Sequence, residues 1–162
     1  MIVTRVIIDA DACPKTCLQI IRKIAVIYDF EVITVASFNH YFEHANHQVT
    51  GNEAQATDIA IINQVREGDI VVTQDWGLAA MALAKHALAI APSGRIYEDE
   101  QMDLLLEERN VLAKFRRDGG RTRGPAKRTP HDDRRFEMNF SSLLKRIIPA
   151  IKSTDVDHGV RR

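Results

Sequence analysis

The chain has 162 residues, of which 45% are hydrophobic and 27% charged, a composition that fits one ordinary globular domain with a single core. It excludes a membrane protein, because no apolar run approaches the roughly 20 residues that span a bilayer, and a disulfide framework, because Cys13 and Cys17 are the only cysteines. The net charge of zero excludes a uniformly basic binder. Since Arg5 interrupts the first apolar stretch, the N-terminus does not resemble a signal peptide, and we expect a cytoplasmic protein.

The neutral total hides a strong segregation of charge. Residues 98–113 carry 6 acidic and 1 basic side chains, a net charge of −5. Residues 114–135 carry 9 basic and 3 acidic side chains, a net charge of +6. An acidic block next to a basic one indicates a local electrostatic surface for a charged ligand.

Predicted strands and helices alternate along most of the chain. Apolar runs predict strands at 5–9, 31–37, 68–75 and 88–92, with shorter ones at 47–50 and 95–98. Helical spacing predicts helices at 14–28, 52–67, 76–87 and about 101–117, and a short final helix at 140–148. Pro14 suits a first helical turn, and Asn52 with Gln55 resembles a capping box.

This alternation predicts an α/β fold in which a parallel sheet is covered by helices on both faces. We expect one domain over residues 1–148, including a basic loop at 118–135 that is rich in Gly, Pro and Arg. Residues 149–162 are expected to form a disordered tail.

Acidic residues follow two of the predicted strands. Asp9 ends the first strand and Asp75 ends the strand at 68–75, so both are expected at the carboxyl edge of the sheet, where ligands bind in such folds. Asp11 lies two residues beyond Asp9 and would point to the same side if the chain stays extended. Singly, Asp11 and Asp75 are equally well interpreted as N-caps of the helices that follow.

Asp58 has no such simple structural role. With Asn52 as the N-cap, Asp58 lies inside a helix on the same stripe as Ile61, Ile62 and Val65. A carboxylate there is costly unless it is paired or binds a metal. Together, Asp9, Asp11, Asp58 and Asp75 predict a catalytic metal site for Mg²⁺ or Mn²⁺ of the kind that cleaves phosphodiesters. A buried ion pair at Asp58, or a shifted helix, remains an alternative.

The basic loop provides candidate contacts to nucleic acid. Arg121, Arg123, Lys127 and Arg128 lie among flexible glycines and are suited to binding phosphates of RNA or DNA. The alternative is a solvated loop that pairs with the acidic block.

Weaker signals accompany these motifs. Thr73 is a candidate for supporting the metal ligands from behind, and Trp76 for stacking a base, although packing at the helix start is the simpler role. Cys13 is interpreted as a small structural residue rather than a nucleophile. The spacing of His40, His44 and His47 is a weak indication of zinc.

The combination of motifs resembles the bacterial YaiI/YqxD family, small uncharacterised proteins with a PIN-like domain. The resemblance rests on the segments DADACP (9–14), ATDIAI (56–61), VVTQDWGLA (71–79), GGRTRGP (119–125) and DDRRF (132–136). It implies a three-layer α/β/α fold. It also implies an acid cluster that binds Mg²⁺ or Mn²⁺ and hydrolyses RNA or DNA, with Asp9, Asp58 and Asp75 as the matching acids and Asp11 as a fourth.

Two other functions compete with a nuclease. The pattern IIDAD also fits haloacid-dehalogenase-type phosphatases, in which Asp9 would be phosphorylated, although the acidic pair they need is not found after a later strand. The third hypothesis is a non-catalytic module that binds nucleic acid and retains an acidic pocket for structural reasons.

Overall fold

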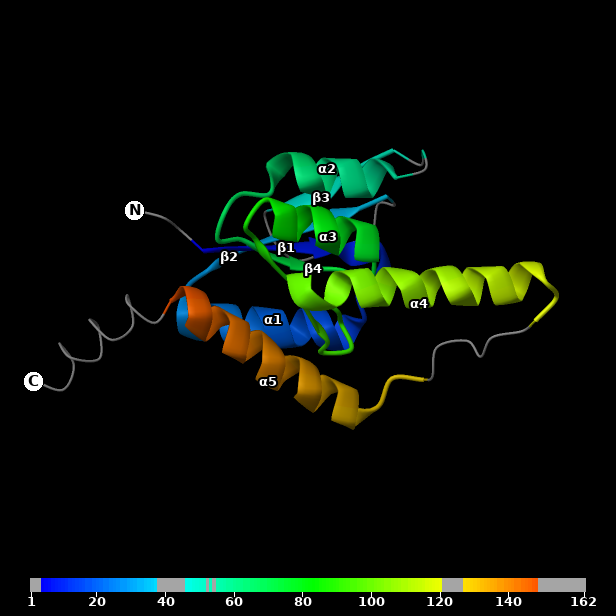
Figure 1. Ribbon diagram of the computed structural model, residues 1–162. Coiled ribbons are helices and arrows are strands. Elements are labelled where there is room, and N and C mark those ends of the chain that lie inside the picture. Colours follow the sequence, from blue (N-terminus) through cyan, green and yellow to red (C-terminus); the bar gives the residue numbers. More distant parts are fainter. Residues whose placement is uncertain (1–3, 38–45, 52, 54, 121–126, 149–162) are drawn as a thin grey trace, which may run out of the picture.

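The computed structural model describes residues 4–37, 46–51, 53, 55–120 and 127–148. A six-stranded sheet lies at the centre, in the order β3-β2-β1-β4-β5-β6, and all neighbouring strands are parallel except β5 and β6. Helices cover both faces of the sheet (Figure 1), which confirms the predicted three-layer α/β/α fold. The strands are β1 (Arg5–Asp9), β2 (Glu31–Ala36), β3 (His47–Val49), β4 (Ile70–Val72), β5 (Leu88–Ile90) and β6 (Ile96–Tyr97). The helices are α1 (Lys15–Tyr28), α2 (Ala56–Gln64), α3 (Trp76–Ala84), α4 (Asp99–Arg117) and α5 (Pro130–Ile147), with a 3-10 turn at Ala10–Ala12.

Different helices cover the two faces because side chains alternate along each strand. Val6 and Ile8 of β1 pack against α1 and α5, whereas Ile7 packs against α2 and α3. All three side chains are fully buried, as expected for a parallel strand with helices on both sides. The continuous apolar run at the start of the chain is therefore a central strand.

The strand order reverses between β1 and β4. From β1 the chain moves outward through β2 and β3, and it then returns to place β4 and β5 on the other side of β1. Helices that connect on opposite faces leave a crevice between the carboxyl ends of β1 and β4, where α/β proteins bind their ligands. Asp9 is the last residue of β1, and Asp75 follows β4.

The last helix is much longer than predicted. The short helix expected at 140–148 is α5, which begins at Pro130, because Thr129 and Asp132 form a capping box and Pro130 occupies the first turn. Its Phe136 and Phe140 rings stack with centroids 5.4 Å apart and are fully buried. Residues 130–135, predicted as part of the basic loop, are therefore helical, and Phe136 and Phe140 of the same helix belong to the core.

Helix α2, in contrast, is shorter than predicted. The prediction of a helix over 52–67 was wrong in its limits, since α2 contains only nine residues. Gln55 precedes it in a left-handed conformation, with a φ of 66°, and its side chain makes no capping hydrogen bond, while Asn52 lies outside the described residues. Asp58 is consequently in the first turn of α2, and Val65, although buried, follows its end.

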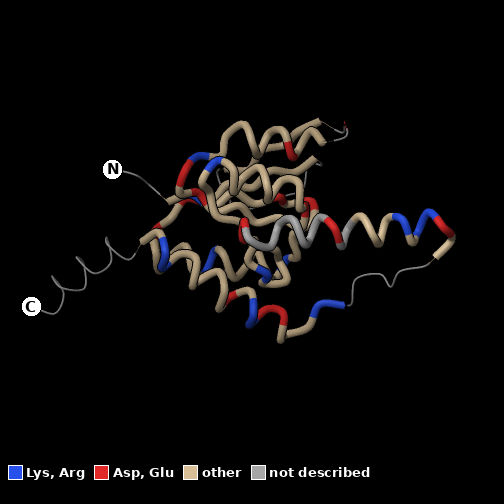
Figure 2. The backbone as a smooth tube through the Cα atoms, viewed as in Figure 1, with Lys and Arg blue, Asp and Glu red and all other residues tan. Residues whose placement is uncertain are grey.

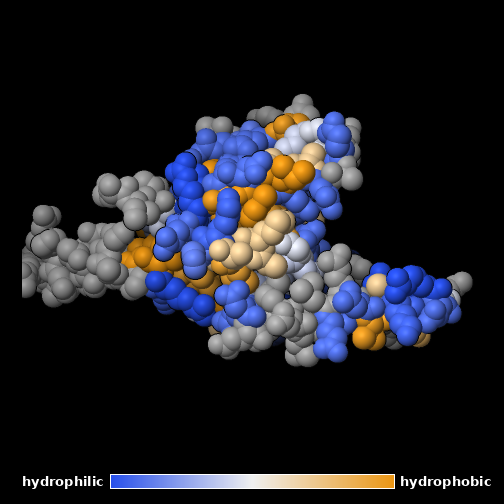
Figure 3. Space-filling view, turned by 45° about the horizontal axis from the view of Figure 1, so that its top comes forward, coloured by the Kyte–Doolittle hydropathy of each residue, from blue (hydrophilic) through white to orange (hydrophobic). Residues whose placement is uncertain are grey.

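Helix α4 extends beyond the body of the protein (Figure 1). Its last turn carries Lys114, Arg116 and Arg117, and Figure 2 shows this basic end away from the sheet. Val111 and Phe115 are exposed apolar residues of the same end, which is otherwise hydrophilic in Figure 3. None of the described helices is both long and apolar enough to cross a membrane.

A buried ion pair ties the amino ends of the central strands together. Arg5 of β1 donates to Asp69, which precedes β4, with an Nη2–Oδ2 distance of 2.5 Å. It also donates to the carbonyl oxygen of Gln64 at 2.6 Å, and Asp69 accepts from the backbone N–H of Arg66 at 2.8 Å. The two side chains are only 11% and 5% exposed, so each charge depends on the other.

Asp69→Ala is expected to lower the free energy of unfolding by about 3–5 kcal/mol, because it leaves the Arg5 guanidinium buried without its counterion. Glu137→Ala is the matched control, since Glu137 pairs with Lys23 on the surface at 3.4 Å, and it should cost less than about 1 kcal/mol. Urea unfolding monitored by circular dichroism measures both values. Equal losses in the two variants would contradict the structural role of Asp69.

Candidate acidic active site

Asp9 and Thr73 form the buried base of the site. The carboxylate of Asp9 is only 8% exposed, and its Oδ2 accepts a hydrogen bond from Thr73 Oγ1 at 3.0 Å. The same hydroxyl oxygen accepts from the backbone N–H of Asp75 at 3.0 Å, and the backbone oxygen of Thr73 accepts from the Tyr97 hydroxyl at 3.1 Å. Thr73 thus lies beside Asp9, and its hydroxyl group donates one hydrogen bond to Asp9 and accepts one from Asp75.

Asp75 has a structural role as well as a place in the site. It is the N-cap of α3, and its Oδ1 accepts from the backbone N–H of Leu78 at 3.0 Å. The interpretation of this residue as an N-cap is therefore correct. It does not exclude a second role, because the cap fixes one oxygen and thereby the orientation of the whole carboxylate.

Asp11 does not continue the line of Asp9. The chain leaves the extended conformation directly after β1 and forms the 3-10 turn, so the condition under which Asp11 would point to the same side as Asp9 is not met. Its carboxylate is exposed and turns toward β2, where its two oxygens lie 3.0 and 2.9 Å from the backbone nitrogen of Ser37, which donates to them. Thr57 of α2 also donates to it at 3.4 Å. These two partners were not identified from the sequence.

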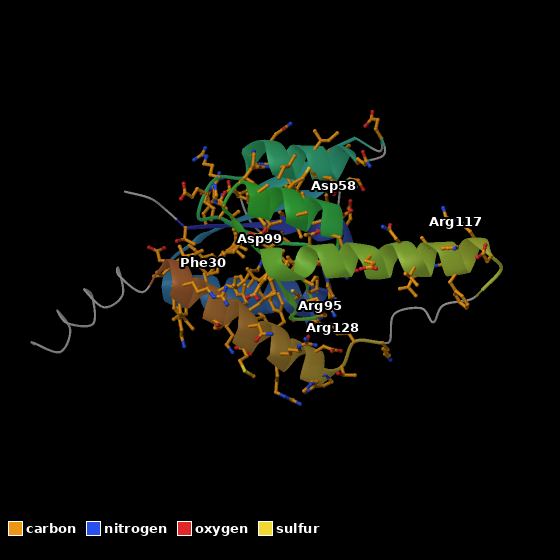
Figure 4. The ribbon with its side chains drawn as sticks, viewed as in Figure 1. Phe30, Asp58, Arg95, Asp99, Arg117 and Arg128 are labelled. Carbon is orange, nitrogen blue, oxygen red and sulfur yellow. The ribbon has the colours of Figure 1, made fainter. Side chains whose placement is uncertain are left out.

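Asp58 reaches the site from the first turn of α2. It is half-buried, and Figure 4 shows it at the end of α2 that lies near α3. Burial raises the pKa of its carboxyl group, and the neighbouring Asp75 raises this pKa further through its charge and a hydrogen bond. The helix shift described above therefore leaves Asp58 beside Asp75 rather than among the apolar side chains of α2.

The four carboxyl groups form one electrostatic cluster. Burial raises the pKa of Asp9 to about 6, against the opposing effect of the Thr73 hydroxyl, and the charges of Asp58, Asp11 and Asp75 act in the same direction as burial. None of the ion pairs between described residues involves any of these four acids. The negative charge at this end of the sheet is therefore uncompensated by protein cations in the described part of the chain.

The donor set suits a hard divalent cation, whose preferred ligands are carboxylate oxygens and water. In the part of the chain that is described, however, no three His, Cys, Asp or Glu side chains stand close enough together to hold a metal ion. The carboxylate of Asp11 accepts from the backbone of Ser37, and the carboxylate of Asp75 accepts from the backbone of Leu78. The four acids thus lie at the same edge of the sheet, but they are too widely spaced for any three of them to bind one ion as they stand.

The predicted phosphate contacts are only partly described. Arg121 and Arg123 lie outside the described residues, and Lys127 is exposed. Arg128 is not a free loop residue as expected, because its Nε pairs with Asp133 at 2.6 Å and its Nη1 donates to the Pro92 oxygen at 2.7 Å. It fastens the beginning of α5 to the loop that follows β5.

The remaining candidates do not form a second site among the described residues. His47 Nδ1 lies 2.6 Å from Thr34 Oγ1, while His40 and His44 lie outside the described range. Cys13 and Cys17 are free thiols. Neither Asp69 nor the DDRR segment at 132–135 supplies the acidic pair of a haloacid-dehalogenase-type phosphatase, because Asp69 pairs with Arg5 and the DDRR segment forms the capped start of α5.

Comparison with known proteins finds relatives over most of the chain. Residues 7–146 match the model of a family described as "Uncharacterized BCR, YaiI/YqxD family". A UPF0178 protein of Heliobacterium modesticaldum is 49% identical over 141 residues, which cover 87% of this chain and 97% of that protein. UPF0178 proteins of Clostridium kluyveri and Exiguobacterium sibiricum are 46% and 45% identical, over 86% and 85% of this chain and 92% and 94% of their own lengths. No solved structure gives a significant match.

The raised pKa of Asp9 predicts that the acid cluster lowers the stability of the fold in a pH-dependent way. The folded state binds the Asp9 proton more tightly than the unfolded state does. The stability that this proton contributes is therefore lost as the pH rises from 3.8 to about 6. Asp9→Asn keeps the acceptor for Thr73 but removes the charge. The variant should be more stable than wild type above pH 6, by on the order of 2 kcal/mol, with no gain near pH 4.

Urea unfolding at several pH values between about 4 and 8 tests this difference. Asp29→Asn is the control, because Asp29 is exposed and follows α1 in a left-handed conformation that Asn also adopts. A constant difference between Asp9→Asn and wild type at every pH would contradict the burial of a titrating carboxyl group.

Proposed function

The chain belongs to the YaiI/YqxD family, as its motifs indicated, and we propose that it is a divalent-metal-dependent nuclease or phosphodiesterase that acts on RNA or DNA. The observation that carries the proposal is the convergence of four carboxyl groups, from β1, the 3-10 turn, α2 and the start of α3, at the strand-order reversal. Such a reversal is where α/β proteins place their ligands.

The electrostatics of the cluster support a cationic ligand. A folded protein gains nothing in stability from a buried carboxyl group surrounded by three others, and perturbed acids of this kind concentrate at functional sites. A divalent cation would favour the ionised form of Asp9 and remove the repulsion that raises its pKa. Its binding is therefore expected to stabilise the fold.

The residues have distinct roles in this proposal. Asp9, Asp58 and Asp75 would hold the cation, and Thr73 orients Asp9 through the hydrogen bond that its hydroxyl donates to Asp9 Oδ2. When bound, Mg²⁺ or Mn²⁺ supplies the positive charge that stabilises a phosphodiester under attack. Asp11, the most exposed of the four, accepts a proton from the attacking water.

A non-catalytic nucleic-acid-binding module is the second candidate. The open spacing of the acids favours it, since no three of them stand within reach of one ion in the described structure. Under this alternative the basic end of α4 and Lys127 bind phosphates, while the carboxyl groups serve only the local structure. It predicts salt-sensitive binding without turnover.

Asp9→Asn and Asp75→Asn are expected to abolish metal-dependent cleavage, because each removes one charge from the cluster while Asn keeps the Thr73 contact or the N-cap. Thr73→Val should reduce the affinity for Mn²⁺ by roughly 10–100-fold, the usual effect of losing a supporting hydrogen bond. Mn²⁺ binding is measured by calorimetry and cleavage on a mixture of labelled RNA and DNA strands.

Asp29→Asn again serves as the control, since it removes an equivalent charge from the exposed turn between α1 and β2. Its metal affinity and cleavage should equal those of wild type. Cleavage that persists undiminished in Asp9→Asn would refute the assignment, and nucleic-acid binding without turnover in wild type under either metal would support the binding module.

A further inference from the structure

A pocket of about 480 Å³ lies directly beside the acid cluster. Gln74 and Trp76, the residues on either side of Asp75, line one wall, and the loop after β5 lines the other with Ser93 and Arg95. This volume falls within the range of roughly 300–1,000 Å³ that is typical of small-ligand sites. Trp76 and Arg128, which the sequence suggested separately as base and phosphate contacts, both line this pocket.

The Trp76 side of the pocket is held in place by Tyr97. Trp76 is half-buried and meets Tyr97 edge to face, with ring centroids 6.2 Å apart. The Tyr97 hydroxyl donates to the backbone oxygen of Thr73, the residue that holds Asp9. The indole therefore has a defined position relative to the acids, and part of it faces the pocket.

Two guanidinium groups supply the positive charge of the pocket. Figure 4 shows Arg95 and Arg128 near each other below α4, and both line the pocket. Arg95 is exposed, and its guanidinium makes no hydrogen bond or ion pair within the described residues. Arg128 is anchored as described above, but its Nη2 is buried and lacks a hydrogen-bond partner in the described structure. Such an unsatisfied donor is rare in folded proteins.

The loop that carries Arg95 is held rigidly. Gly94 has a φ of 94°, and a Cβ there would lie 3.0 Å from the backbone of Arg135 and Phe136 in α5. Asn139 of α5 donates to the Gly94 oxygen at 2.6 Å. The wall opposite Trp76 is therefore positioned by the part of α5 that precedes the predicted helix limits, and a preorganised site loses little entropy on binding.

Asp132 is the acidic group of the pocket lining. Its carboxylate accepts hydrogen bonds from the backbone N–H and hydroxyl of Thr129, at 2.8 and 3.2 Å, as part of the capping box. The backbone hydrogen bond from Thr129 lowers the pKa of Asp132. This charge is engaged by the helix start, which leaves the Arg95 guanidinium and the unsatisfied Nη2 of Arg128 as the polar groups available to an anionic ligand.

We propose that this pocket binds one nucleotide of an unpaired nucleic-acid strand, with its phosphate on Arg95 and Arg128 and its base against the Trp76 indole. Guanidinium groups match phosphate geometry, and base stacking on an aromatic side chain needs a base that is free of a duplex. The inference deepens the proposed nuclease function. Because Gln74 and Trp76 line the pocket and flank Asp75, a strand held here would pass next to the acid cluster.

Trp76 provides a direct measurement, because it is the only tryptophan of the chain. Its fluorescence is titrated in EDTA with a single-stranded RNA of about six nucleotides, the matching duplex, AMP and inorganic phosphate. Quenching by the single strand that weakens with added salt is expected, with much weaker effects of the other three ligands. EDTA removes the metal, so the result does not depend on catalysis.

Arg95→Ala tests the phosphate contact without disturbing the fold, and we expect at least about a fivefold loss of affinity. Arg66→Ala is the matched control, because Arg66 is an equally exposed arginine before β4, at the opposite edge of the sheet. Trp76→Phe, measured by anisotropy of a labelled strand, should weaken binding by a similar factor. Arg128→Lys keeps a charge for the contacts with Asp133 and should still weaken binding, because Lys lacks the planar fork.

The outcomes separate this inference from the nuclease proposal. Absence of quenching, or equal affinities of Arg95→Ala and Arg66→Ala, overturns the pocket assignment even if metal-dependent cleavage is found. Binding of AMP or the duplex as tight as that of the single strand overturns the assignment to an unpaired strand. Quenching that follows the expected pattern supports the pocket, and it does so even if no metal supports turnover.

Discussion

The reversal of strand order between β1 and β4 is the constraint on which the rest of this structure depends. Because β1 is central and fully buried, whatever follows it must turn away from the sheet at a point where helices on both faces diverge. Asp9 and Asp75 lie at that point because Asp9 ends one apolar strand and Asp75 follows another. The same reversal brings the loop after β5 to the neighbourhood of Asp75 and so creates the second wall of the adjoining pocket.

The buried carboxylates at the two edges of the sheet have opposite electrostatic surroundings. At the amino edge, Asp69 is neutralised by Arg5 and accepts further hydrogen bonds, so its charge supports the fold. At the carboxyl edge, Asp9 accepts a hydrogen bond from a hydroxyl group but forms no ion pair with any described Lys or Arg, and its charged neighbours are other acids. One edge therefore maximises stability, while the other retains an unfavourable charge distribution of the kind found at functional sites.

Much of this arrangement follows from local patterns, and the failures have physical causes. Apolar runs identify the strands, and strand ends identify Asp9 and Asp75. The orientation of Asp11 depends on a 3-10 turn that no periodicity indicates. The beginning of α5 was taken for a loop because its first residues are polar and include the capping Asp132. The first apolar residue of this helix that packs in the core is Phe136, so no helical pattern is visible before it. The pairing of Arg128 with the Pro92 oxygen, 36 residues away in the chain, is a tertiary contact that no local pattern contains.

Thr73 connects the acid cluster and the pocket through different atoms of one buried residue. Its hydroxyl binds Asp9, and its backbone oxygen binds Tyr97, on which Trp76 rests. A change in the position of Thr73 would therefore alter both its contact with Asp9 and, through Tyr97, the wall of the pocket formed by Trp76. The geometry of the acids and the geometry of the pocket thus depend on the placement of the same buried residue.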